Sequence, residues 1–156
     1  MISEKIDDVI ELALIKLPKH DIAGALEILE GAGEIEQHQA EIDNLKADCY
    51  YLLGDFYQAK QYWEKVLGYN KNNKTAKNKL EKFNSPAFQF WVKRYYQAIE
   101  FIENKDFVAA QENLQKLMKE NDSFVSLYQL LGLTYLALND EKGAIKMWKQ
   151  GLKLDI

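Results

Sequence analysis

The single cysteine and the two histidines of this 156-residue chain are its first candidates for a nucleophile or a metal ligand: Cys49, His20 and His38. A nucleophile needs a base within hydrogen-bond reach, and a metal ion needs several convergent ligands. Neither histidine stands in a metal-spaced motif, and no base is spaced to activate the cysteine. We therefore expect a buried, inert thiol and surface histidines, with no catalytic residue, no metal site and no cofactor.

Two further segments could bind phosphate groups. Gly31-Ala32-Gly33 is too short for a dinucleotide loop and follows a predicted helix rather than a strand, so we interpret it as a helix end. The other segment interleaves basic and aromatic side chains, which suits a nucleic-acid patch. Its residues are Lys71, Lys74, Lys77, Lys79, Lys82, Phe83, Phe88, Phe90, Trp91, Lys93 and Arg94.

The charge of the chain is small overall but unevenly distributed. Twenty basic and 24 acidic residues give a net charge of −4, yet residues 1–59 carry −9, residues 60–94 carry +7 and residues 95–156 carry −2. The basic segment fits lysines on solvated helix faces, an anionic partner or an acidic protein surface. A single arginine, an isoelectric point of about 5.3 and aromatics at core spacing argue against nucleic acid.

The composition, 47% hydrophobic and 28% charged, is typical of a globular domain. No apolar run approaches the roughly 18 residues that span a bilayer. The N-terminal residues are acidic and amphipathic, unlike a secretory signal or a basic transit peptide. One cysteine excludes an internal disulfide framework and favours a reducing compartment. These observations predict a cytoplasmic protein without a membrane partner.

The elements that position these side chains are predicted from a pattern that recurs along the chain. An aspartate at position 21, 55, 106 or 140 is followed four residues later by alanine and eight residues later by leucine or tryptophan. The intervals between the aspartates are 34, 51 and 34 residues. A period of 34 residues is typical of helix-turn-helix repeat arrays. The sequence therefore predicts an all-α protein.

Helical periodicity and stop signals divide the chain into predicted helices. Pro18, Gly54 and Ser85-Pro86 mark the clearest boundaries. Aromatic and apolar residues cover most of the circumference of the helix at 86–104, which predicts contacts on several of its sides. The predicted helices span residues 3–17, 21–30, 35–53, 56–68, 75–83, 86–104, 107–119, 123–138 and 141–154.

The last predicted helix pair, residues 124–156, resembles a tetratricopeptide repeat. The residues that match the family's columns are Tyr128, Leu131-Gly132, Tyr135, Asn139-Asp140, Ala144, Trp148, Gly151-Leu152 and Leu154-Asp155. Residues 46–67 and 97–118 fit the same columns, and a degenerate copy surrounds Asp21. The resemblance implies an α-solenoid of about four helix pairs that binds other proteins and has no catalytic role.

The interval of 51 residues equals one 34-residue repeat plus 17 further residues, which leaves room for one extra helix. An odd helix reverses the alternation of inner and outer helices in a solenoid. We therefore expect one domain, 1–156, with repeats one and two in residues 1–70, the extra helix and joint in residues 71–85, and repeats three and four in residues 86–156.

The resemblance also implies a binding site on the concave face, which the first helix of each pair lines. The residues carried over to that face are Asn44, Asp48, Tyr51, Tyr95, Ile99, Ile102, Gln129 and Leu133, with Leu136 beside them. Some relatives hold a C-terminal carboxylate pair with basic and amide side chains, but only Asn44 fits that clamp here. An amphipathic helix or a hydrophobic peptide is the expected ligand. The apolar residues of the third copy fit a groove or a core equally well.

The predicted function is a non-catalytic scaffold, an adaptor or chaperone-like binding module. The alternative is self-association into a homodimer through the C-terminal helix. In that helix Ala144, Trp148, Gly151 and Leu152 are predicted to face inward. The residues predicted to stay partly uncovered are Ile145, Met147, Leu154 and Ile156.

Overall fold

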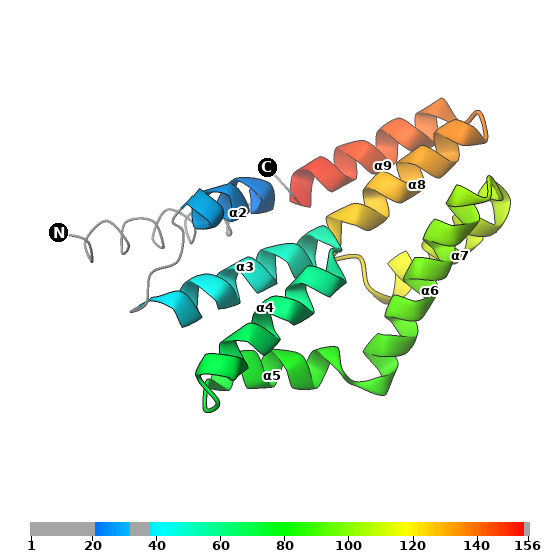
Figure 1. Cartoon of the computed structure of the whole chain (residues 1–156). Helices are drawn as coiled ribbons and strands as arrows, with labels where there is room; N and C mark the ends of the chain where they lie inside the picture. Colours follow the sequence, from blue (N-terminus) through cyan, green and yellow to red (C-terminus); the bar gives the residue numbers. More distant parts are fainter. Residues whose placement is uncertain (1–20, 32–37, 155–156) are drawn as a thin grey trace. The chain divides into compact units, whose positions relative to one another are not determined.

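The computed structural model describes residues 21–31 and 38–154, and all regular structure in these residues is helical (Figure 1). The helices are α2 (Ile22–Gly31), α3 (Gln39–Leu53), α4 (Phe56–Tyr69), α5 (Lys74–Phe83), α6 (Pro86–Glu103), α7 (Phe107–Glu120), α8 (Val125–Ala137) and α9 (Glu141–Leu154). The predicted all-α fold is confirmed. The helix predicted at 3–17, His20 and Ile156 lie outside the described residues.

The recurring aspartate is a helix-capping residue. Before α4, α7 and α9 its side chain accepts a hydrogen bond from the backbone N–H three residues later, over 3.2 Å at Asp55, 3.3 Å at Asp106 and 2.9 Å at Asp140. Asp21 makes the same bond at 3.0 Å before α2. The first N–H groups of a helix have no partner within the helix, so this side chain fixes where the second helix of each pair begins.

The predicted helix boundaries agree with the structure to the usual one or two residues, except at α3. That helix begins at Gln39, because the backbone of His38 is not helical, and residues 35–37 of the predicted helix lie outside the described residues. Gly54 ends α3 with a φ of 86°, in the left-handed region that glycine adopts without strain. Ser85 caps α6 by accepting a hydrogen bond from the Phe88 N–H.

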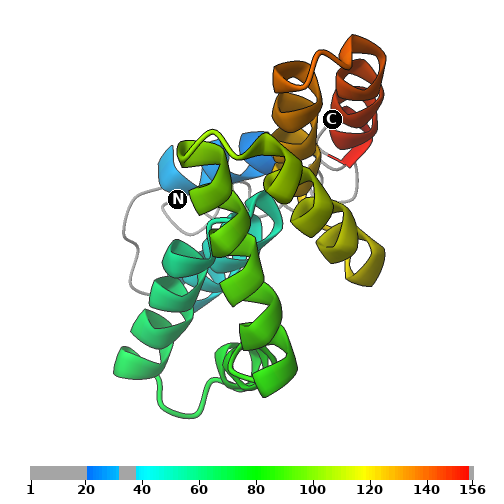
Figure 2. The ribbon, with the colours of Figure 1, turned by 90° about the vertical axis from the view of Figure 1, so that its right-hand side faces the viewer.

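The described residues form two compact units, each with its own core. The first reaches to Asn84, and in it α3 packs against α2 and α4, while α5 packs against α4. The second spans residues 85–154, and in it α7 packs against α6 and α8. Helices α8 and α9 run side by side in both views (Figures 1 and 2). The finer organisation into 1–70, 71–85 and 86–156 remains a prediction.

Small residues allow the two helices of a pair to approach each other closely. The alanine four residues after each aspartate is fully buried in all four copies. In the last pair a Cβ on Gly132 would overlap the indole ring of Trp148, and a Cβ on Gly151 would lie 2.9 Å from that of Tyr128. The repeated small residues therefore set the spacing between paired helices.

The aromatic helix α6 buries one face rather than its whole circumference. Trp91, Val92 and Tyr95 are buried, whereas Phe90 is 60% and Tyr96 is 45% exposed. The prediction of contacts on several sides is wrong for these two rings, because aromatic composition alone does not show which side of a helix meets its neighbours.

Candidate partner-binding surface

The polar binding residues predicted in the second repeat contact α5 or its N-cap. The Asn44 amide nitrogen donates to the Asn73 side-chain oxygen at 3.2 Å, and that oxygen also accepts from the Ala76 N–H at 3.0 Å. The Lys79 Nζ lies 3.5 Å from an Asp48 carboxylate oxygen. The N-cap of α5 therefore hydrogen-bonds to Asn44, and Lys79 of α5 pairs with Asp48, although the sequence assigns both residues to a binding face.

The third predicted residue of this repeat, Tyr51, packs against core rings. Its ring centroid lies 5.9 Å from that of Phe56 and 5.8 Å from that of Trp63. Burial raises the pKa of Tyr51, and the nearby Asp48 carboxylate raises it further. Burial also raises the pKa of Asp48, while the charge of Lys79 opposes that shift. Both residues are partly desolvated by their own unit.

A buried carboxylate lies beside these residues and was not singled out from the sequence. Asp43 is fully buried, and it accepts hydrogen bonds from Gln39 Nε2 at 2.9 Å and from the Tyr69 hydroxyl at 3.0 Å. The Lys65 Nζ lies 3.6 Å away. Burial, together with the bond to Asp43, raises the pKa of Tyr69. A buried charge is tolerated only when it is paired, so this network ties the start of α3 to the end of α4.

The residues predicted in the third repeat lie in or beside the core of the second unit. Tyr95 is only 4% exposed and stacks on Trp91 with ring centroids 5.7 Å apart. The Trp91 indole nitrogen donates to the Leu117 carbonyl at 3.2 Å, which anchors α6 to α7. Ile99 and Ile102 are half-buried. The sequence leaves open whether the apolar residues of the third repeat line a groove or form a core, and the burial of Tyr95 favours a core position for that residue.

The fourth repeat presents its predicted residues to solvent. Gln129, Leu133 and Leu136 follow one another at helical spacing on a single face of α8, and all three are exposed. Leu133 is 45% and Leu136 is 44% exposed, whereas Leu131 on another face of α8 is buried. We name Gln129, Leu133 and Leu136 the α8 surface. It contains the two predicted binding residues that are most accessible to a partner.

Two shallow depressions lie elsewhere on the described helices. One, of about 410 Å³, is on α4. The other, of about 430 Å³, is bordered by α7, α8 and α9, and at its rim Gln115 Nε2 donates to the Tyr135 hydroxyl at 2.7 Å. The first is lined by Gln58, Gln61, Tyr62, Glu64 and Lys65, and the second by Gln115, Met118, Lys119, Leu131, Tyr135 and Met147. Neither depression is lined by the cysteine, serine or histidine side chains of a typical nucleophile-and-base pair.

The cysteine and the described histidine, which the sequence offers as a possible nucleophile and a possible metal ligand, both lie in or beside α3. Cys49 is buried, as predicted. The His38 Nδ1 lies 3.9 Å from a Glu41 carboxylate oxygen. Across residues 21–31 and 38–154, no group of three or more histidine, cysteine or carboxylate side chains could hold a metal ion. In the same residues, no helix combines the length and the apolar character needed to cross a membrane.

The basic and aromatic segment is partly used inside the units. Arg94 forms an ion pair with Glu120 and lies over the Phe90 ring, 4.7 Å from its centroid. Phe83 is buried and meets the Trp63 ring edge-on at 5.9 Å. The burial of Phe83 and Trp91 supports the interpretation of core spacing made from the sequence, whereas the exposed Phe90 does not.

Comparison with known proteins identifies the repeat. The family model described as tetratricopeptide repeat matches residues 40–73 and 125–155. The first match contains α3 and α4, and the second contains α8 and α9. The resemblance inferred from the sequence is therefore confirmed for these two repeats. A search of curated proteins found no match.

Two solved structures are similar to the chain over nearly its whole length. "MamA AMB-1 P212121" is 13% identical, with a TM-score of 0.39, and the alignment covers 96% of this chain and 88% of that one. "MamA MSR-1 C2" is 14% identical, with a TM-score of 0.39, and the alignment covers 99% of this chain and 96% of that one.

Proposed function

We propose that this chain, in which the tetratricopeptide-repeat model matches residues 40–73 and 125–155, is a non-catalytic adaptor or chaperone-like module that binds other proteins. The α8 surface, the first-helix face of the fourth repeat, is the proposed binding site. Its ligand is an amphipathic or hydrophobic peptide, or a helix of a partner protein. The observation that supports this proposal is the exposure of Leu133 and Leu136 beside Gln129 on one face of α8.

The chemistry of the α8 surface suits a segment with apolar side chains. Covering a leucine that is about half exposed removes apolar area from water and contributes roughly 1 kcal/mol at about 25 cal/mol per Å². Gln129 can both donate and accept a hydrogen bond, so it can pair with the backbone or a polar side chain of the ligand. The predicted ligand therefore combines apolar anchors with at least one polar contact.

Self-association is the second candidate function. Ile145 on α9 is 49% exposed, and Met147 and Leu154 are half-buried, as that prediction requires. Leu152 was expected to face inward but is 59% exposed, which enlarges the apolar area that a second copy could cover. For the cellular location we propose the reducing cytoplasm, on the basis of the single buried thiol of Cys49.

A selected peptide tests the α8 surface directly. Peptides isolated from a random displayed library against the wild-type protein should bind the Leu133→Glu variant at least tenfold more weakly, a loss of about 1.4 kcal/mol. Val108→Glu is the matched control, because Val108 is 56% exposed on α7 of the same unit. Both variants should retain the wild-type melting temperature, since both positions face solvent. Equal affinity of the wild type and Leu133→Glu for every selected peptide would exclude the α8 surface as the site.

A further inference from the structure

The copies of the repeat differ in whether their second helix is covered on its far side. Each aspartate is followed eight residues later by a large apolar side chain, and three of these are buried: Leu29 is 0%, Trp63 is 1% and Leu114 is 0% exposed. In each case the next helix packs against the helix that carries the residue, α3 on α2, α5 on α4 and α8 on α7. At Trp63 the covering contact is visible as the edge-on ring of Phe83.

The equivalent face of α9 is uncovered in the described residues. Trp148, which occupies the same position in the fourth copy, is 38% exposed. Ile145 and Leu152 stand three residues before it and four after it, and they are 49% and 59% exposed. These three residues form one stripe along α9, which we name the α9 face. Trp148 meets α8 as expected, although its ring is only partly covered, whereas the expectation that Leu152 faces inward is wrong.

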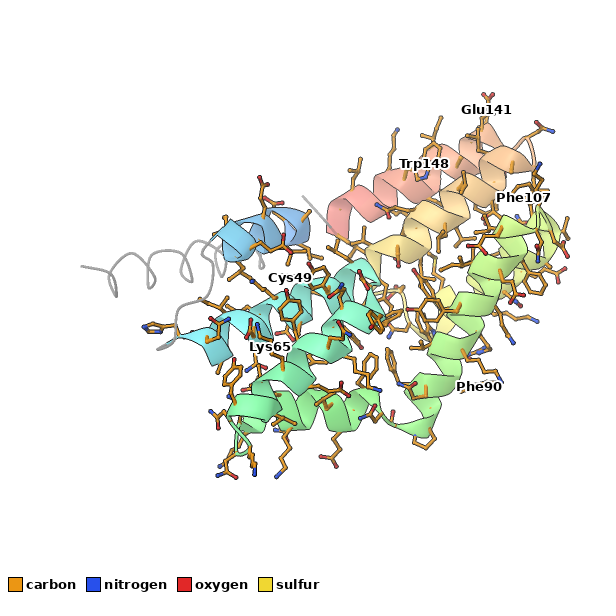
Figure 3. All side chains as sticks on the ribbon, viewed as in Figure 1. Cys49, Lys65, Phe90, Phe107, Glu141 and Trp148 are labelled. Carbon is orange, nitrogen blue, oxygen red and sulfur yellow. The ribbon has the colours of Figure 1, made fainter. Side chains whose placement is uncertain are left out.

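The α9 face is held in place by its neighbour α8. The Trp148 indole lies on Gly132, and its Nε1 is 3.5 Å from the backbone oxygen of Gln129. Figure 3 shows Trp148 where α9 faces α8. A ring fixed on one side loses little conformational freedom when a partner covers the other side, so the face is already ordered for binding.

A row of positive charges runs along one edge of the α9 face. Four lysines directly follow Glu141 and the three residues of the α9 face in the sequence, and all four are exposed. These residues are Lys142, Lys146, Lys149 and Lys153. A partner that covers the apolar stripe therefore brings one of its own edges close to four positive charges, and acidic residues at that edge are favoured.

We infer that the α9 face binds an amphipathic helix of a partner protein, with an apolar stripe flanked on one side by acidic residues. The partner helix packs on α9 as α8 packs on α7 and as α5 packs on α4. Its apolar side chains cover Ile145, Trp148 and Leu152, and its carboxylates lie beside the lysines. This inference goes beyond the proposed function, because it concerns α9 rather than the α8 surface and assigns a charge to the partner.

Two designed peptides test this inference. Both form a helix with apolar residues at positions i, i+3, i+4 and i+7, and one carries glutamate along the flank where the other carries lysine. The wild-type protein should bind the glutamate peptide at least tenfold more tightly than the lysine peptide at low salt, with a smaller ratio at high salt. Leu152→Glu should lower the affinity for the glutamate peptide at least tenfold, while Val108→Glu should leave it unchanged.

A charge exchange separates recognition from nonspecific attraction. In a variant with Lys146→Glu, Lys149→Glu and Lys153→Glu, the preference should reverse toward the lysine peptide. A preference that stays the same, or a glutamate peptide that binds Leu152→Glu as tightly as wild type, would overturn the inference. A wild-type dimer in light scattering that Leu152→Glu converts to a monomer would assign the face to a second copy instead and would also overturn it. None of these results depends on Leu133, so failure here leaves the proposal for the α8 surface standing.

Discussion

At the scale of single residues, the fourth repeat depends on one contact between a glycine and a tryptophan. Gly132 has no side chain, and the indole of Trp148 occupies the space where a Cβ would stand. Trp148 in turn supports the α9 face and lies against Gln129 of the α8 surface. Both proposed binding surfaces therefore depend on the absence of a methyl group at position 132.

Gly132→Ala should be destabilising for this reason. The added methyl group forces the ring of Trp148 to move, and such overpacking typically costs about 1–3 kcal/mol. Gly68→Ala is the control, because no atom lies within 4 Å of a Cβ there, and alanine in a helix is favoured over glycine by up to about 1 kcal/mol. Urea denaturation should therefore shift the two midpoints in opposite directions. A Gly132→Ala variant as stable as wild type would show that Trp148 swings away freely.

Asp48 gives a prediction that depends on pH. Burial raises its pKa above the ordinary value of 3.8, and Lys79 offsets only part of the effect. The folded state thus binds this proton more tightly than the unfolded state, so the associated stability is present below pH 3.8 and is lost as the pH rises through the folded pKa. Asp48→Asn should raise the melting temperature at pH 7, and the gain should shrink toward pH 4. A lower melting temperature at pH 7 would mean that the ion pair with Lys79 outweighs the desolvation of Asp48.

At the scale of helices, local signals made most of the fold predictable. Aspartate caps, the glycine at position 54 and the serine-proline pair before α6 act within a few residues, so the sequence alone locates the ends they control. The start of α3 is harder to predict, because helical composition continues through His38, whose backbone is not helical. Local composition therefore predicts which helices exist better than it predicts each first residue.

The capping aspartates provide a test at this scale. Asp106→Ala removes the acceptor for the Ala109 N–H at the start of α7 and should cost about 1 kcal/mol of unfolding free energy. Asp106→Asn keeps an acceptor oxygen and should recover most of that loss. Chemical denaturation of both variants measures the difference. If alanine and asparagine prove equally stable at position 106, the recurring aspartate has another role.

At the scale of the whole molecule, the binding surface was harder to predict than the fold. The family's columns assign equivalent faces to each repeat, but they do not say which faces the chain itself covers. Asn44 and Asp48 lie on α3, the first helix of their repeat, as predicted. Their partners, Asn73 and Lys79, belong to the N-cap and the body of α5, which lies outside the repeat pattern. Exposure of Leu133 and Leu152 likewise depends on which neighbouring helix is present.

The same reasoning explains why the fourth repeat carries both proposals. The second repeat is engaged by α5, and Tyr95 of the third lies in the core of its unit. On the described residues of the fourth repeat, five large apolar side chains remain between 38% and 59% exposed: Leu133, Leu136, Ile145, Trp148 and Leu152. Apolar exposure concentrated on one helix pair is the usual mark of an interaction surface.

The central claim, that the fourth repeat binds the partner, is tested most directly by locating a bound peptide on the protein. Leucine methyl groups labelled for nuclear magnetic resonance report contact at each position during titration with a library-selected peptide. The account predicts the largest shifts at Leu133 and Leu136 of α8, with small shifts at Leu52 and Leu53 of α3. Large shifts confined to α3, with α8 unchanged at saturation, would contradict it.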